Sequence, residues 1–306
     1  MRKLFKTTGS VLLSIIAIPI SQIIAQLGTI VIPIIVYFTR KIFFGIQMPT
    51  NLSLTLQDNK IFQVYYIIFN NLLSLFLLFL IIKFLSKYIF HRDVIKDFYK
   101  KKIKIIYFII PIFMCLTAYI IYFLFVDGKF VLNKINTFNF FISFLDMVLG
   151  TAIVAPIIEE TIFRGIVANV IEENYGLGLS FICSSFIFGA VHILNGELSF
   201  LSIVMLLVSG FEMGALLFIV KKTFNSLNAS IIVHGGYNFL SSIILISNKN
   251  SKDWPLLYKI RTSNLLITGG DYGVSVSIVS LLIIVVTIFF LFMESKNKNM
   301  NNSLKT

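Results

Sequence analysis

The stretch Pro156-Ile-Ile-Glu-Glu-Thr-Ile-Phe-Arg-Gly165 lies inside an apolar segment that extends from about residue 138 to 170. A helix needs about 20 mainly apolar residues to cross a bilayer, so this segment is long enough to span one. Each of the two acids and the arginine raises the free energy of inserting such a segment into the membrane by roughly 2.5–3.5 kcal/mol. Such residues therefore normally face a protein interior or an aqueous cavity. The stretch therefore predicts a membrane-spanning helix that contributes to a polar site.

The rest of the chain has the composition of a membrane protein. Of its 306 residues, 57% are hydrophobic and 13% are charged, whereas a soluble domain has about 25% charged residues. Backbone polar groups in lipid must be satisfied within their own segment, and no alternating strand pattern occurs. We therefore predict an all-α fold, a polytopic transmembrane helix bundle of about eight spans. The expected apolar segments are approximately 9–39, 61–82, 105–126, 138–170, 177–194, 199–220, 226–247 and 273–293.

The net charge of +12 comes from Lys and Arg residues that lie mostly between the apolar segments, above all in the basic loop 83–104. The positive-inside rule then places both termini in the cytoplasm. This topology explains the basic charge without a nucleic-acid partner, and the expected surroundings are the lipid bilayer. The sequence is rich in Lys, Asn, Ile and Phe, as expected from AT-rich codons, which indicates a low-GC bacterium. The expected location is therefore the cell membrane of such a bacterium, which the chain crosses several times. Neither cysteine belongs to a CxxC pair or a disulfide framework.

Polar residues recur in two further apolar segments, each time four residues apart. Phe188 and His192 lie in the fifth segment, and His234 and Asn238 lie in the seventh. Residues at i and i+4 share one face of a helix, so each pair can present two groups to the same point. We expect these side chains to converge with a carboxylate of the fourth segment.

The fourth segment supplies two acids with different expected roles. Glu160 and Arg164 are at i and i+4 and are predicted to form a salt bridge. Glu159 is rotated by roughly 100° from Glu160 and points elsewhere, toward the bundle. Glu212 and Asp146 are two more acids inside apolar segments, and both are expected to serve either structure or the lining of a cavity.

The three motifs together resemble those of the CAAX protease and bacteriocin-processing (CPBP) family of intramembrane glutamate-dependent endopeptidases. They are Glu159-Glu160-Thr-Ile-Phe-Arg164, Phe188-Gly-Ala-Val-His192 and His234-Gly-Gly-Tyr-Asn238. The resemblance covers roughly residues 140–245. On this basis we divide the chain into N-terminal helices with the basic loop (1–135), a catalytic core (136–250), and a last helix with a basic tail (251–306).

The resemblance implies hydrolysis of a peptide bond within the membrane. Glu159 and His192 would activate a water, and His234 and Asn238 would stabilise the oxyanion. Glu160, Arg164 and Phe188 would support them. The expected substrate is a membrane-associated or secreted peptide or protein precursor. No cofactor is expected, although a Glu with two His residues also suits zinc, which is the minority alternative.

Two questions stay open at this point. The rival functions are a non-catalytic membrane scaffold or bacteriocin-immunity protein, and a transporter that relays protons through buried acids. The depth of the site is also unsettled. Counted from the expected segment ends, Glu159 lies about 30 Å from the outer end of its helix and His192 about 22 Å from the inner end of its own. This count places the two residues at different depths.

Overall fold

The computed structural model of the chain describes residues 2–45, 56, 58–91, 101–195, 198–251 and 254–303. Part of the basic loop 83–104, namely residues 92–100, lies outside the described residues. The α-helices are α1 (Arg2–Phe44), α3 (Lys60–Leu85), α4 (Ile106–Phe125), α5 (Thr137–Asp146), α6 (Ala155–Glu160), α7 (Ala168–Tyr175), α8 (Leu177–Val191), α9 (Phe200–Phe224), α10 (Leu227–Ile243), α11 (Leu265–Thr268) and α12 (Ile278–Ser303). The strands are β1 (Gly128–Leu132), β2 (Leu245–Ser247) and β3 (Leu256–Ile260).

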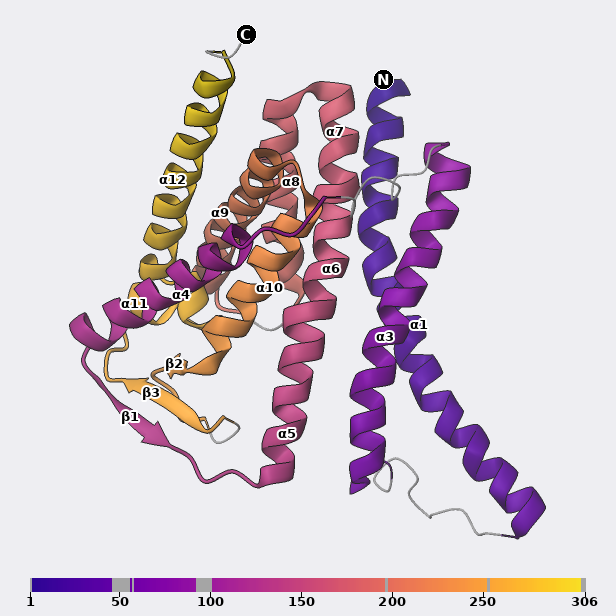
Figure 1. Cartoon of the computed structure of the whole chain (residues 1–306). Coiled ribbons are helices and arrows are strands. Elements are labelled where there is room, and N and C mark those ends of the chain that lie inside the picture. Colours follow the sequence, from indigo (N-terminus) through magenta and orange to yellow (C-terminus); the bar gives the residue numbers. More distant parts are fainter. Residues whose placement is uncertain are drawn as a thin grey trace.

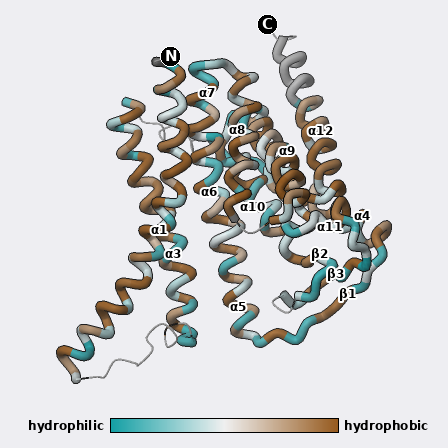
Figure 2. The backbone as a smooth tube through the Cα atoms, turned by 180° about the vertical axis from the view of Figure 1, so that it is seen from behind, coloured by the Kyte–Doolittle hydropathy of each residue, from teal (hydrophilic) through white to brown (hydrophobic). Residues whose placement is uncertain are grey.

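The described helices form a polytopic membrane bundle, which confirms the predicted fold class. Six of them are long and apolar enough to cross a bilayer. The other two predicted spans are shorter, because α10 has 17 residues and the apolar part of α12 is confined to Ile278–Glu294. Large apolar side chains such as Phe76, Phe113 and Phe289 are exposed on the bundle, and Figure 2 shows long hydrophobic stretches along α1 and α12. Such a surface is suited to lipid. The six candidate spans are Lys3–Phe44, Lys60–Phe90, Ile106–Phe125, Thr137–Tyr175, Leu177–Leu194 and Phe200–Phe224.

The helix that carries the two acids is one continuous column (Figure 1). It begins with α5, passes through the π-helical segments Met147–Val154 and Thr161–Val167 on either side of α6, and ends with α7. The sequence prediction ended this helix near residue 170, which is too early. The turn is Gly176 alone, whose φ of 87° is readily available to glycine.

This longer helix resolves the question of depth. Because α7 and α8 form a tight hairpin about Gly176, both helices can be measured from the same turn. Glu159 and His192 then each lie roughly 25 Å from Gly176 along their helices, so they are level with one another. The count from the sequence had measured the two residues from opposite ends of their helices, and the first of these helices extends to Tyr175 rather than to about residue 170.

A small sheet that the sequence did not predict closes one end of the bundle, in the strand order β1-β3-β2. β1 is antiparallel to β3, with Gly128 opposite Ile260, and β2 is parallel to β3, with Leu245 opposite Leu257. Strands β1 and β3 belong to two loops that the sequence placed on the same side of the membrane. The pairing joins these loops, and Figure 1 shows the start of α1 and the end of α12 at the opposite end.

Two apolar cores hold the helices around the column. Tyr107 of α4, Phe188 of α8, Leu216 of α9 and Val233 of α10 belong to one buried cluster, which also includes Ile284 of α12. The second cluster joins α1 and α3 to the column, with Leu78 and Ile82 of α3 packed with Ile162. The N-terminal helix pair is therefore a wall of the bundle, packed directly against the column that carries Glu159.

Candidate active site

The side chains singled out in the three motifs meet in the interior of the bundle. Glu159 is in α6, His192 follows α8, and His234 is in α10. The Oε2 atom of Glu159 lies 3.8 Å from Nε2 of His192 and 3.9 Å from Nε2 of His234. The exposed fractions of the three side chains are 23%, 19% and 7%, respectively. One carboxylate thus faces two imidazoles at a place that a small ligand can reach.

Beneath this group lies a fully buried ion pair. Glu160 Oε1 accepts a hydrogen bond from Arg164 at 2.9 Å and lies 3.0 Å from Nδ1 of His234. The exposed fractions of Glu160 and Arg164 are 0% and 1%. Arg164 also donates to the carbonyl oxygen of Gly214 at 3.2 Å. Buried charges need such partners, so the pair is a structural anchor that fixes the imidazole of His234.

Phe188 packs against the site through its ring. The centroid of this ring lies 4.9 Å from that of His192 and 5.8 Å from that of His234. The guanidinium carbon of Arg164 lies 4.1 Å from the same centroid, a cation–π geometry. The ring therefore restricts how both imidazoles can turn.

The hydrogen bonds of the two histidines constrain their protons. Nδ1 of His192 lies 2.7 Å from the carbonyl oxygen of Phe188, and a carbonyl can only accept, so Nδ1 is the donor. In the neutral ring, Nε2 of His192 is then free to accept a proton. Nδ1 of His234 faces the carboxylate of Glu160 and is likewise a donor. For Nε2 of His234 to donate as well, this ring must carry both protons.

Asn238 lies in the same cavity but points its amide at the column. Its Nδ2 donates to the carbonyl oxygen of Thr151 at 3.0 Å. Thr151 is in the π-helical segment Met147–Val154. Gly235, one turn earlier in α10, lies very close to the same segment. A Cβ added to Gly235 would overlap the carbonyl oxygen of Ala152. Close packing of α10 on the column thus sets the position of Asn238.

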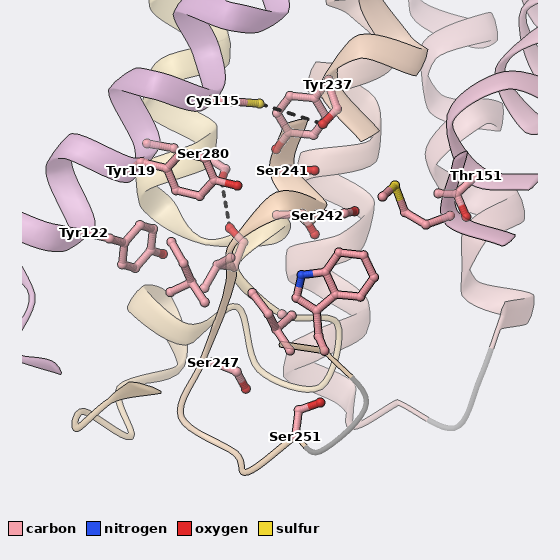
Figure 3. Close-up of a pocket in the computed structure, with 18 of the residues that line it drawn as sticks. Cys115, Tyr119, Tyr122, Thr151, Tyr237, Ser241, Ser242, Ser247, Ser251 and Ser280 are labelled. Atoms are coloured by element: carbon pink, nitrogen blue, oxygen red, sulfur yellow. Dashed lines mark hydrogen bonds between the residues drawn. The ribbon is translucent and has the colours of Figure 1, made fainter. Parts of the chain in front are cut away.

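A cavity of about 540 Å³ contains Glu159, His192, His234 and Asn238. A second cavity of about 570 Å³ adjoins it and shares Thr151 and Tyr237 with it. Figure 3 shows this second cavity, with Ser241 and Ser242 on one wall and Ser247 and Ser251 toward the sheet. The two cavities together connect the site with the end of the bundle that the sheet closes.

Sequence reasoning missed several residues that line the cavity containing Glu159. Gln22 and Gln26 of α1 and Asn70 and Asn71 of α3 are among them. The available signal was their chemistry, because they are carboxamides inside otherwise apolar segments. Tyr272, from the loop before α12, lines both cavities; its position depends on the folding of a distant loop and had no local signal.

The two remaining intramembrane acids, Asp146 and Glu212, are not among the side chains that meet around Glu159. Asp146 lines the second cavity. The ion pair that the structure shows for Arg164 is with Glu160, as the spacing predicted, and not with Glu212. Glu212 Oε2 is buried and has no hydrogen-bond partner among the described residues. Within the described ranges, no group of three or more His, Cys, Asp or Glu side chains has the arrangement of a metal site.

Comparison with known protein families gives a match to the part of the chain that carries the three motifs. Residues 141–240 match the Rce1-like family, described as type II CAAX prenyl endopeptidase Rce1-like. No curated protein and no solved structure matches the chain. The matched segment includes all three motifs, and the family is one of membrane-embedded proteases. Residues 141–240 are therefore an Rce1-like domain of the CPBP family, within a multi-pass helical membrane protein.

Proposed function

We propose that this protein is a glutamate-dependent intramembrane endopeptidase that acts without a metal on a membrane-associated or secreted peptide precursor. We place it in the cell membrane of a low-GC bacterium, with bacteriocin processing or immunity as its setting. The observation that carries the chemistry is the distance of 3.8 Å between Glu159 Oε2 and His192 Nε2. This distance exceeds a direct hydrogen bond and suits two groups that share one water.

The reaction begins with that water between Glu159 and His192. Glu159 accepts one of its protons as general base, and the hydroxide oxygen bonds to the carbonyl carbon of the scissile peptide. His192, with Nδ1–H held by the Phe188 carbonyl, accepts a hydrogen bond at Nε2 and so orients the water. The carbonyl π electrons move to oxygen. The electron pair on oxygen then re-forms the C=O bond as the C–N bond breaks, and the proton held by Glu159 passes to the leaving nitrogen.

The negative charge that develops on oxygen needs donors in a site with little water. His234 supplies Nε2–H when it carries both protons, and the adjacent Glu160 accepts its Nδ1–H. Asn238 supplies the second N–H of an amide whose first N–H is bound to Thr151. A single donor of this kind contributes about 2.7–4 kcal/mol to transition-state stabilisation.

The test is cleavage of a pooled library of membrane-tethered peptides by the purified full-length protein in liposomes. Glu159→Gln keeps the shape of the side chain and removes the base, so we expect cleavage to fall by about 10²- to 10⁴-fold. His192→Ala is expected to lose activity as well. Glu172→Gln, at the end of the same column where Glu172 pairs with Lys222, is the matched control and should cleave like the wild type.

A strong chelator separates this mechanism from zinc chemistry. Cleavage that is indifferent to the chelator supports the metal-free mechanism, and sensitivity to it supports zinc held by Glu159, His192 and His234. Cleavage that survives Glu159→Gln would refute the role of Glu159. A wild type that binds peptides from the library without cutting any would favour the scaffold or immunity function.

A further inference from the structure

One wall of the catalytic cavity comes from helices that lie outside the matched domain. Gln22 and Gln26 of α1 and Asn70, Asn71 and Ser74 of α3 line the cavity that contains Glu159. Gln22 and Gln26 are one helical turn apart, and both are exposed. They lie near the middle of α1, at the depth where polar side chains in a membrane usually face a cavity. We call Gln22, Gln26 and Asn70 the carboxamide wall.

Asn71 is not part of this wall, because the structure uses it for packing. Its Nδ2 donates to the carbonyl oxygen of Ile67 at 2.9 Å. Its amide lies against Gly150, where a Cβ would come within 3.4 Å of Asn71 Oδ1 and 3.2 Å of Asp146 Oδ1. Asn71 thus packs α3 against the column. The three residues of the carboxamide wall remain available to a ligand.

Asn70 differs from Asn71 in its hydrogen bonding. Asn70 Oδ1 is buried and has no hydrogen-bond partner among the described residues. An unpaired buried carbonyl oxygen costs free energy, which an N–H donor from a ligand would recover after a small rotation of the amide. Glu159 Oε2, in the same cavity, is also buried without such a partner. A ligand that brings N–H or O–H donors into the cavity would therefore satisfy both oxygens.

The chemistry of the wall selects the kind of ligand. A carboxamide carries a donor and an acceptor without charge, as a peptide group does. A helical substrate satisfies its own backbone groups, but a segment opened for hydrolysis does not, and in lipid these groups need partners. An isoprenoid chain has no donor or acceptor and would leave the amides unpaired. The wall is thus complementary to an extended peptide.

We propose that Gln22, Gln26 and Asn70 bind the backbone of an extended substrate segment next to the scissile bond, and that they select an opened peptide rather than a prenyl group. This inference rests on the proposed peptidase function. It assigns to α1 and α3 a part in substrate binding, and it makes the wall a positioning element that acts on no reacting atom.

Photo-cross-linking tests occupancy of the wall without requiring turnover. A diazirine residue is placed at position 26 of the full-length protein carrying Glu159→Gln, in liposomes, with the pooled membrane-tethered peptides in farnesylated and unmodified forms. The control position is Gln63, a carboxamide of α3 that lines a separate cavity of about 520 Å³ with Phe62 and Tyr66. We expect cross-links at position 26, equally with both peptide forms, and at least several-fold fewer at position 63.

Cleavage by otherwise wild-type protein tests the energetic role. Asn70→Leu and Gln26→Met remove hydrogen-bonding groups at similar volume, so each is expected to lower kcat/KM by about 2- to 10-fold. The loss should appear mainly in KM. Gln63→Met is the matched control and should leave both constants unchanged. Replacing the substrate amide next to the scissile bond by an ester should lower wild-type kcat/KM and have a smaller effect on Asn70→Leu.

The outcomes separate this inference from the proposed function. Equal cross-linking at positions 26 and 63, a preference for farnesylated peptides at position 26, or variants that cleave like Gln63→Met would overturn it. Cross-linking at position 26 with no cleavage by any form would refute the peptidase and retain the peptide-binding wall. Absence of both cross-linking and cleavage would overturn both.

Discussion

Replacing Arg164 by Met removes the cation that compensates Glu160 in the interior. Glu160 would keep its hydrogen bonds with His234 Nδ1, at 3.0 Å, and with Ser230, but it would have no cation beside it, and its exposed fraction is 0%. Breaking a buried pair by removing one partner costs about 3–5 kcal/mol. Loss of the hydrogen bond to the Gly214 carbonyl and of the contact with the Phe188 ring acts in the same direction. We therefore expect Arg164→Met to lower the free energy of unfolding by at least about 3 kcal/mol.

The double variant Glu160→Gln with Arg164→Met separates charge from packing. With no buried charge left uncompensated, we expect its free energy of unfolding to return to within about 2 kcal/mol of the wild type. The amide oxygen of the glutamine at position 160 can still accept a hydrogen bond from His234 Nδ1, but it carries no negative charge beside this ring. Cleavage of the peptide library should therefore stay low although the fold is restored.

The assay is denaturant titration in mixed micelles, followed by the fluorescence of Trp254, the only tryptophan in the chain. Its indole N–H donates to the carbonyl oxygen of Ile243, so it reports on the junction of α10 with the sheet. Lys222→Met, which removes the partly exposed pair with Glu172, is the control and should cost less than about 1 kcal/mol. The reasoning is refuted if Arg164→Met costs as little as this control, or if the double variant is less stable than Arg164→Met.

Two further predictions concern the supports of the site. Gly235→Ala should push α10 away from the carbonyl of Ala152. It should lower the free energy of unfolding by about 1–3 kcal/mol and remove most of the cleavage activity. Gly178→Ala is the control, because an added Cβ there has no atom within 4 Å, and it should be neutral or stabilising in the same titration. Hydrogen bonds from Ser199 and Ser202 hold the pKa of the Asp271 carboxyl below its ordinary value. The ionised carboxylate therefore contributes fully to stability at pH values above its ordinary pKa. This contribution is lost as the pH falls through the lowered pKa of the folded state. The protection of amide hydrogens at the start of α9, calculated from exchange rates corrected for the intrinsic rate at each pH, should therefore decrease below about pH 4 in the wild type, and a variant Asp271→Asn should show no such step.

The sequence by itself determined the membrane fold and drew attention to the residues of the candidate site. Apolar segments of spanning length have few physical solutions, because backbone groups in lipid must be paired within a helix. The cost of ionisable groups in lipid makes residues such as Glu159 and His192 visible without any structure. The spacing of Glu160 and Arg164 was likewise sufficient to predict their pairing, since the i, i+4 geometry is local.

Tertiary structure alone decided the features that depend on contacts distant in sequence. Glu159 and His192 lie at the same depth because α7 and α8 form a hairpin. Its single turn residue, Gly176, could not be located from apolar composition. The pairing of β1 with β3 joins residues more than a hundred positions apart, and short strands carry little local signal. The approach of Asn70 to Glu159 follows from how α3 packs on the column. A carboxamide in an apolar segment shows that it needs a polar partner, but only the packing of helices determines which cavity provides one.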